Sequence, residues 1–263
     1  MSSRSYRSNV LFKENRKVDE VEKFFAEVAA NIGSLKADAD MLALSRKWLK
    51  LSAKHRYSYN FTWLGRPIIQ YPSDVLALQE IIWKVKPDLI VETGVAHGGS
   101  VIFSASILEL LAADGGVVGI DIDIRKHNRD EIERHPMSKR ITLLEGSSTS
   151  NGIVAQVRDL AAGRKPILVI LDSNHTHDHV LEELELYSPL VGKDSYIIVF
   201  DTVVEDIDED DAPPQRPWGK GNNPKTAVWE FLRRNERFEV DLDIEAKLSV
   251  TVAPDGYLKC VKD

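Results

Sequence analysis

Four carboxylate side chains stand at the ends of apolar runs, where they are placed to do chemistry. Glu92, Asp121, Asp172 and Asp201 each end such a run or directly follow it. If the runs are parallel strands, these side chains gather at one rim of a sheet, and open α/β sheets bind ligands outside that rim. The alternative is that each acidic residue only begins the turn after its strand. Because the pattern occurs four times, we favour a binding site.

A glycine-rich segment follows the first of these runs and opens a predicted helix. It reads Glu-Thr-Gly-Val-Ala-His-Gly-Gly-Ser from Glu92 to Ser100. Gly94 permits a tight turn, and Gly98 with the glycine after it lets a ligand approach backbone N–H groups at a helix N-terminus. The spacing is not the G-x-G-x-x-G of a dinucleotide site. It is closer to S-adenosylmethionine sites, in which an acidic residue meets the ammonium group of the ligand, and Asp121 can accept both ribose hydroxyl groups.

Short apolar runs alternate with helical stretches from residue 87 onward, which predicts a doubly wound α/β sheet. The runs are nearly continuous in Val, Ile and Leu, as in parallel strands that are buried on both faces. The predicted strands cover residues 88–93, 116–121, 141–146, 167–172 and 196–201, with helices near 100–111, 130–135, 152–162 and 180–187. Further strands are expected at an antiparallel edge, at 238–243, 248–253 and 257–261, around a turn at Asp255-Gly256.

The first eighty residues predict helices instead. Apolar residues at three- and four-residue spacing indicate amphipathic helices at 18–32 and 38–54. The segment 57–74 is expected to be irregular, because glycine and proline residues interrupt it. Ser73 or Asp74 is expected to cap the helix that follows.

Composition and charge narrow the class of protein. The chain has 263 residues, and 34 Lys and Arg against 41 Asp and Glu give a formal net charge of −7. An acidic chain without a long basic stripe is a poor candidate for binding nucleic acid. The single cysteine, Cys260, cannot form an internal disulfide, and no apolar run approaches the roughly 20 residues that span a bilayer. We therefore expect a cytoplasmic protein without a nucleic-acid or membrane partner.

Four longer blocks resemble the cephalosporin hydroxylase family. They are ETGVAHGGS at 92–100, GIDIDIRKHNR at 119–129, LDSNHTHDHVLEELELY at 171–187 and RPWGKGNNPKTAVWEFL at 216–232. The resemblance implies an S-adenosylmethionine-dependent, Mg²⁺-assisted O-methyltransferase, similar to macrolide-sugar and rhamnosyl O-methyltransferases. The implied fold is an α/β class I methyltransferase domain in residues 73–263, with a doubly wound, mostly parallel, seven-stranded Rossmann-like sheet. Residues 1–72 would form an N-terminal helical extension.

The resemblance also implies the residues of the site. The pocket for the methyl donor would be formed by Glu92, Gly94, His97, Gly98, Ser100, Asp121, Asp123, Ser147 and Asp172. The metal site would centre on Asp172 and Asp201, and His175 would act as general base, with Asp172 as the second catalytic residue. The residues support this in part, because carboxylate oxygens suit Mg²⁺ and an imidazole is suited to take a proton near neutral pH.

One position departs from the family pattern. The related sugar methyltransferases have an acidic residue directly before the aspartate that closes the second of these strands, whereas this chain has Phe200 before Asp201. One carboxylate ligand is therefore missing. We expect Thr202, Glu205 or water to complete the metal site.

A run of three histidines, His175, His177 and His179, suggests a second kind of metal site. With an intervening aspartate, such a set would suit zinc or an iron oxygenase. The spacing argues against this interpretation, because on a helix His175 and His179 share a face while His177 points away. We assign His175 to catalysis and expect the other two histidines to pack at the start of a helix.

Two segments are expected to contact the methyl acceptor. The loop 216–223 follows the strand that ends at Asp201 and is expected to fold over the site as a lid, with Trp218 touching the substrate. Tyr71 belongs to an aromatic segment that either lines the acceptor pocket or packs the N-terminal helices onto the domain. The acidic stretch from Asp208 to Asp211 is expected to be a solvated loop.

Three functions remain open from the sequence. The first is an O-methyltransferase that acts on a hydroxyl group of a sugar or another small natural product. A nicotinamide-dependent oxidoreductase is disfavoured, because the glycine spacing does not suit a pyrophosphate. A methyltransferase-like subunit that supports a partner enzyme is kept open by Phe200. The family resemblance also suggests that the N-terminal helices form a homo-oligomer contact.

Overall fold

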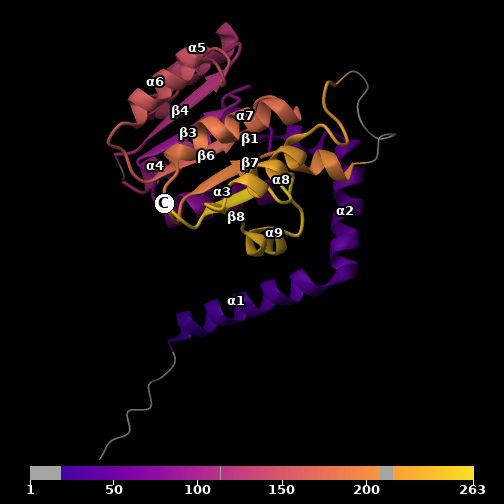
Figure 1. The fold of residues 1–263 in the computed structure, drawn as a ribbon. Helices are drawn as coiled ribbons and strands as arrows, with labels where there is room; N and C mark the ends of the chain where they lie inside the picture. Colours follow the sequence, from indigo (N-terminus) through magenta and orange to yellow (C-terminus); the bar gives the residue numbers. More distant parts are fainter. Residues whose placement is uncertain (1–18, 113, 208–215) are drawn as a thin grey trace, which may run out of the picture.

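The apolar runs after residue 87 form one mixed sheet. The computed structural model describes residues 19–112, 114–207 and 216–263, and its strand order is β5-β4-β3-β6-β7-β9-β8 (Figure 1). The first five strands in this order are parallel, and β9 pairs antiparallel with both β7 and β8. The bounds are β3 Leu89–Thr93, β4 Gly116–Asp121, β5 Ile141–Glu145, β6 Ile167–Leu171, β7 Tyr196–Val199, β8 Phe238–Val240 and β9 Tyr257–Cys260. The predicted seven-stranded, mostly parallel sheet is confirmed.

Helices cover both faces of the sheet, because successive strand residues point to opposite sides. Ile90 of β3 belongs to a core with side chains of α3, α4 and α5, whereas Val91 belongs to a core with side chains of α6, α7 and α8. The bounds are α3 Pro72–Val85, α4 Gly99–Leu110, α5 Lys126–Arg134, α6 Asn151–Ala161, α7 His177–Tyr187 and α8 Pro224–Arg234. Short 3₁₀ turns lie at η1 Tyr57–Asn60, η2 Pro136–Arg140, η3 Ser188–Leu190 and η4 Thr202–Asp206. Because the strands β3 to β7 are parallel, their carboxyl ends lie together at one rim of the sheet.

The C-terminal tail differs from the prediction. The segment 248–253 is not a strand, and a helix, α9 Leu242–Leu248, stands before it. Both edges of β9 already pair with β7 and β8, so no edge of β9 is free for a third partner. The segment is bound instead to Asp74, which accepts hydrogen bonds from the Thr251 hydroxyl and from the Val252 backbone N–H, the latter at 3.1 Å.

The N-terminal residues form two helices that extend away from the sheet (Figure 1). They are α1 Glu20–Ala37 and α2 Ala39–Ala53, as predicted, and no residue of α1 is buried. The segment expected to be irregular contains a short antiparallel pair, β1 Phe61–Trp63 and β2 Arg66–Ile68. Leu64 and Gly65 make this turn with positive φ angles of 46° and 87°.

The predicted cap of α3 is wrong. The helix begins at Pro72, and the Asp74 carboxylate is fully buried against Thr251, Val252 and Tyr257 instead of capping the helix. The domain boundary between residues 72 and 73 stays a prediction.

Within the described ranges, no helix combines the length and apolar character that crossing a bilayer requires.

Candidate active site

The glycine-rich loop joins β3 to α4 and passes close to the end of β6. Gly94 has a φ of 92°, and a Cβ there would overlap the backbone carbonyl of Asp172. Gly98, with a φ of 83°, precedes α4, and a Cβ there would overlap the side chain of Ile132. Both positions therefore require glycine. Gly94 thereby lets the glycine-rich loop lie against the backbone of Asp172, directly after β6.

Asp121 at the end of β4 holds the other side of this loop. Its Oδ2 accepts hydrogen bonds from the backbone N–H groups of Val95 at 2.9 Å and Ala96 at 3.1 Å. Its Oδ1 accepts from the N–H of Asp123 at 3.2 Å, and the side chain of Asp123 is exposed. Asp121, the predicted partner of the ribose hydroxyl groups, therefore also fixes the backbone of the glycine-rich loop.

Glu92 lies under the loop and is only 1% exposed. The Ser100 hydroxyl donates to its Oε1, and Oε2 is buried without a hydrogen-bond partner among the described residues. Burial raises the pKa of Glu92 to about 7, and the hydrogen bond from Ser100 opposes this rise. A buried acceptor without a donor suits a cationic group of a ligand, such as the ammonium group of S-adenosylmethionine.

The remaining predicted pocket residues lie on the same rim. The His97 carbonyl accepts hydrogen bonds from the Arg66 guanidinium at 2.8 and 3.1 Å, and Arg66 also binds Asn128 at 3.0 Å. Ser147, half-buried in the loop after β5, has its hydroxyl 3.3 Å from that of Thr149. The loops after β3 and β5 are thus each fixed by side-chain contacts.

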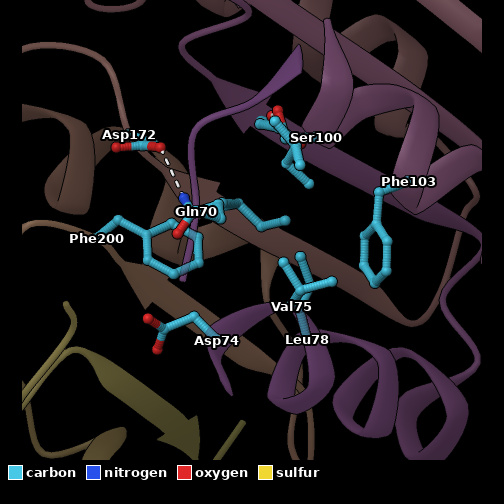
Figure 2. Close-up of a pocket in the computed structure, with 11 residues that line it drawn as sticks. Gln70, Asp74, Val75, Leu78, Ser100, Phe103, Asp172 and Phe200 are labelled. Carbon is cyan, nitrogen blue, oxygen red and sulfur yellow. Dashed lines mark hydrogen bonds between the residues drawn. The ribbon is translucent and has the colours of Figure 1, made fainter. Parts of the chain in front are cut away.

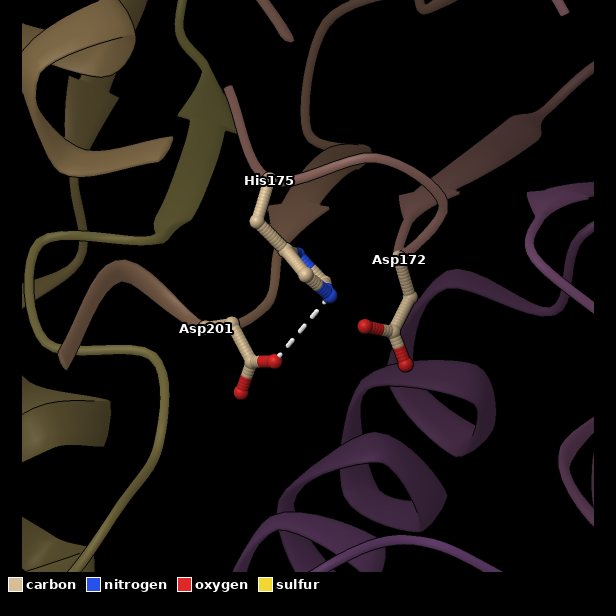
Figure 3. A group of neighbouring side chains, drawn as sticks. All are labelled: Asp172, His175 and Asp201. Carbon is tan, nitrogen blue, oxygen red and sulfur yellow. Dashed lines mark ion pairs between the residues drawn. The ribbon is translucent and has the colours of Figure 1, made fainter. Parts of the chain in front are cut away.

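Asp172, His175 and Asp201 form an acidic cluster at the ends of the neighbouring strands β6 and β7 (Figure 3). One ligand atom from each of the three residues lies within 4.8 Å of the others. His175 Nε2 is 3.2 Å from Asp201 Oδ2. Such a set of donors can hold a divalent cation. The structure therefore brings together the predicted base and the two predicted metal carboxylates.

Gln70 supports this cluster from a cavity beneath it. Its amide donates to Asp172 Oδ2 at 3.1 Å, and Phe200 and Asp74 line the same cavity (Figure 2). Burial, followed by the charges of Asp201 and Glu92, raises the pKa of Asp172 well above its usual range. A bound cation would favour the ionised carboxylate. Gln70 is separated from Asp172 by 102 positions, and no sequence signal identified it.

Two predicted site residues are engaged elsewhere. The Thr202 hydroxyl is buried and donates to the carbonyl of Pro254 at 2.6 Å, outside the acidic cluster. Tyr71 is buried against the rings of Trp48 and Tyr57, with its hydroxyl 3.0 Å from that of Ser52. These contacts pack α2 onto the domain, which is one of the two roles expected of the aromatic segment.

Trp218 lies beside the predicted base. Its ring meets that of His175 edge-on, at 4.9 Å between centroids and an interplanar angle of 81°, and the Arg216 guanidinium lies 5.4 Å from the indole ring. Glu205 holds the loop, because it accepts hydrogen bonds from the Asn223 amide and from the Gly221 N–H. The expected acidic loop from Asp208 to Asp211 lies outside the described residues.

The other two histidines have separate partners. The His177 ring lies 2.8 Å from the Thr226 hydroxyl and 3.3 Å from Glu230, both on α8. His179 contacts Glu183 on α7 at 3.4 Å. The three histidines therefore share no site, and the predicted packing of His177 and His179 around the start of α7 is confirmed.

Solved structures share the fold of this chain. The apo structure of CmcI-N160 matches with a TM-score of 0.56 and 20% identity, over 78% of each chain. An O-methyltransferase from Bacillus cereus in complex with SAH matches with a TM-score of 0.50 and 16% identity, over 92% of this chain and 97% of that one. These two matches show that the chain shares its overall α/β fold with both solved structures.

Sequence comparison identifies the family. The family model for rhamnosyl O-methyltransferase/CmcI matches residues 55–261. The rhamnosyl O-methyltransferase of Mycobacterium leprae (strain TN) is 31% identical over 214 residues, which cover 78% of this chain and 87% of that protein. Its counterpart from Mycobacterium bovis (strain BCG / Pasteur 1173P2) is 30% identical over 75% of this chain and 77% of its own. The chain belongs to the rhamnosyl O-methyltransferase/CmcI family and is an S-adenosylmethionine-dependent O-methyltransferase.

Proposed function

We propose that this enzyme methylates a hydroxyl group of a sugar or a sugar-bearing natural product, with Mg²⁺ bound at the acidic cluster. The observation that carries the proposal is the meeting of Asp172, His175 and Asp201 within 4.8 Å, next to the glycine loop at Gly94. The relatives from Mycobacterium named as rhamnosyl O-methyltransferases support a sugar as the acceptor.

We assign the methyl donor to the rim of the sheet, at the glycine-rich loop. Glu92 presents an unpartnered carboxylate oxygen for an ammonium group, and Asp121 is placed for ribose hydroxyl groups at the end of β4. The other residues assigned to the donor are Gly94, His97, Gly98, Ser100, Asp123, Ser147 and Asp172. When bound, S-adenosylmethionine supplies an electrophilic methyl group.

The acidic cluster fits Mg²⁺ through its carboxylates. Asp172 and Asp201 provide oxygen ligands, and Mg²⁺ usually keeps several waters. Phe200 is buried in the cavity beside Gln70 and offers no ligand atom, so water would complete the coordination of a bound Mg²⁺. When bound, Mg²⁺ lowers the pKa of an acceptor hydroxyl group.

His175 takes the proton of the acceptor hydroxyl group. Asp201 lies 3.2 Å from His175 Nε2, so it orients the ring and stabilises the imidazolium that forms. Trp218 meets the same ring edge-on, and its indole N–H is buried without a hydrogen-bond partner among the described residues. We assign this N–H to an oxygen of the acceptor.

The test measures S-adenosylhomocysteine formed with a panel of rhamnosides and macrolide glycosides, in Mg²⁺ and in EDTA. We expect turnover with a glycoside only in Mg²⁺, and a His175→Ala variant about 10²- to 10⁴-fold slower. His177→Ala is the matched control, because His177 contacts α8 and not the acidic cluster. Full turnover of His175→Ala would exclude the base, and unchanged turnover in EDTA would exclude the metal.

Support of a partner enzyme by this methyltransferase is the second candidate function. Phe200 favours it, because a buried phenyl ring stands where the family resemblance implies an acidic residue. A protein that binds S-adenosylmethionine but methylates no glycoside alone would support this candidate. A Phe200→Glu variant that gains Mg²⁺ affinity would show that the ring limits metal binding.

We propose that the N-terminal helices form a contact between copies of this chain. Phe24 and Phe25 of α1 are 59% and 63% exposed, although apolar side chains of this size are usually covered. Light scattering after size-exclusion chromatography should give a multiple of the monomer mass, and Phe24→Ser/Phe25→Ser should reduce it.

A further inference from the structure

A second buried carboxylate lies outside the acidic cluster. Glu183 of α7 is 0% exposed, and its Oε1 accepts hydrogen bonds from the hydroxyl groups of Ser148 at 2.6 Å and Ser173 at 2.8 Å. His179, one turn earlier on α7, places its Nε2 at 3.4 Å from the same oxygen. Burying a carboxylate costs free energy unless it is paired. These three contacts pair Oε1, whereas Oε2 is buried without a hydrogen-bond partner among the described residues.

The two serines belong to different functional loops. Ser148 follows Ser147 in the loop after β5, which is assigned to the methyl donor, and Ser173 follows Asp172 in the loop after β6. Tyr187, one turn beyond Glu183, donates to the backbone carbonyl of Ser148 at 2.6 Å. His179, Glu183 and Tyr187 lie one turn apart on the same face of α7. The helix therefore fixes the spacing between the loop after β5 and the loop after β6.

The His179 ring completes the junction between the loops. Its Nε2 is 3.1 Å from the Ser148 hydroxyl and 3.2 Å from the Ser173 hydroxyl. Glu183 and His179 thus contact both loops through Ser148 and Ser173. The residues assigned to the donor and to the metal, Ser147 and Asp172, are the sequence neighbours of these two serines. Groups that orient ligand-binding residues from behind commonly change affinity when they are removed.

We propose that Glu183 is a positioning residue that sets the distance between the methyl-donor loop and Asp172. It touches neither cofactor nor acceptor. Its two serine contacts have different roles. Ser148 positions the loop that is assigned to the donor, and Ser173 positions the Asp172 carboxylate at the acidic cluster. This inference rests on the proposed assignment of Ser147 and Asp172.

The test compares Glu183→Leu with Glu183→Gln in calorimetric titrations of S-adenosylmethionine. Leucine removes the acceptor, and we expect the Kd to rise about tenfold. Glutamine retains a carbonyl oxygen that accepts both serine hydroxyl groups, so its Kd should stay within about twofold of the wild type. Ser195→Ala is the control, because this buried hydroxyl donates to the Ile167 carbonyl at 2.7 Å at the start of β6, at the other end of that strand.

Single hydroxyl deletions separate the two loops. Ser148→Ala should raise the Kd for S-adenosylmethionine without changing the affinity for Mg²⁺. Ser173→Ala should lower the rate of methyl transfer and the affinity for Mg²⁺, and it should also raise that Kd, because Asp172 is assigned to the donor as well as to the metal. A Glu183→Leu protein with wild-type Kd, or a Kd raised equally in Ser195→Ala, would overturn the proposal. If Glu183→Leu does not fold, the two serine variants decide. A wild type that binds the donor but methylates no glycoside would contradict only the proposed function.

Discussion

Glu92 predicts how binding of the methyl donor depends on pH. Its carboxyl group is 1% exposed, and burial raises its pKa to about 7. We expect the ammonium group of S-adenosylmethionine to bind the ionised form, so affinity should rise with pH. The ionised fraction is about one tenth at pH 6 and about one half at pH 7, which gives about a fivefold gain in affinity across this interval.

The assay is calorimetric titration with S-adenosylmethionine in EDTA at pH 6, 6.5 and 7. Binding should release about half a proton at pH 7, which two buffers of different ionisation enthalpy would reveal. Glu92→Gln is the control, because it keeps the side-chain shape and cannot ionise. This variant should bind more weakly and with an affinity that does not change between pH 6 and 7.

Two results would refute the reasoning. A wild-type affinity that is constant from pH 6 to 7, without proton release, would show that the ammonium group does not meet Glu92. An equal pH dependence in Glu92→Gln would assign the titration to another group.

Burial raises the pKa of Asp74 from 3.8 to about 6. The free energy of unfolding should therefore fall by about 2 kcal/mol from this group as pH rises from 4 to 6. Urea denaturation should show this decline in the wild type and not in Asp74→Asn; parallel curves would contradict it. Gly94→Ala should destabilise by about 2–4 kcal/mol, because its Cβ would overlap the Asp172 carbonyl at a φ of 92°. Gly33→Ala on α1, where a Cβ meets nothing within 4 Å, should instead stabilise by up to about 1 kcal/mol in thermal denaturation. Asp201→Asn should weaken Mg²⁺ binding in titrations with the metal while S-adenosylmethionine still binds, and unchanged Mg²⁺ affinity would exclude this ligand.

The parallel part of the fold was predictable because its signals are local. Continuous apolar runs define the strands, and the predicted strand at 88–93 is found at Leu89–Thr93. The tail was not predictable in this way. The segment 248–253 is as rich in valine as a strand, but the edges of β9 are occupied and Asp74 binds Thr251 and Val252 instead.

The sequence by itself determined which chemical groups stand at the rim. Glu92, Asp121, Asp172 and Asp201 follow apolar runs, and parallel strands bring their carboxyl ends to one edge. The spacing of three residues between Asp172 and His175 was enough to place the predicted base beside the two predicted metal carboxylates.

Only the tertiary structure decided which side chains hold those groups in place. Gln70 donates a hydrogen bond to Asp172, which lies 102 positions later in the sequence, and the Thr202 hydroxyl donates to the Pro254 carbonyl. Glu183 accepts hydrogen bonds from serines of two loops that are distant in sequence. These partners are selected by packing through space, where a buried polar atom must bind whichever donor or acceptor the fold brings to it. The order of residues along the chain carries no local signal for that choice.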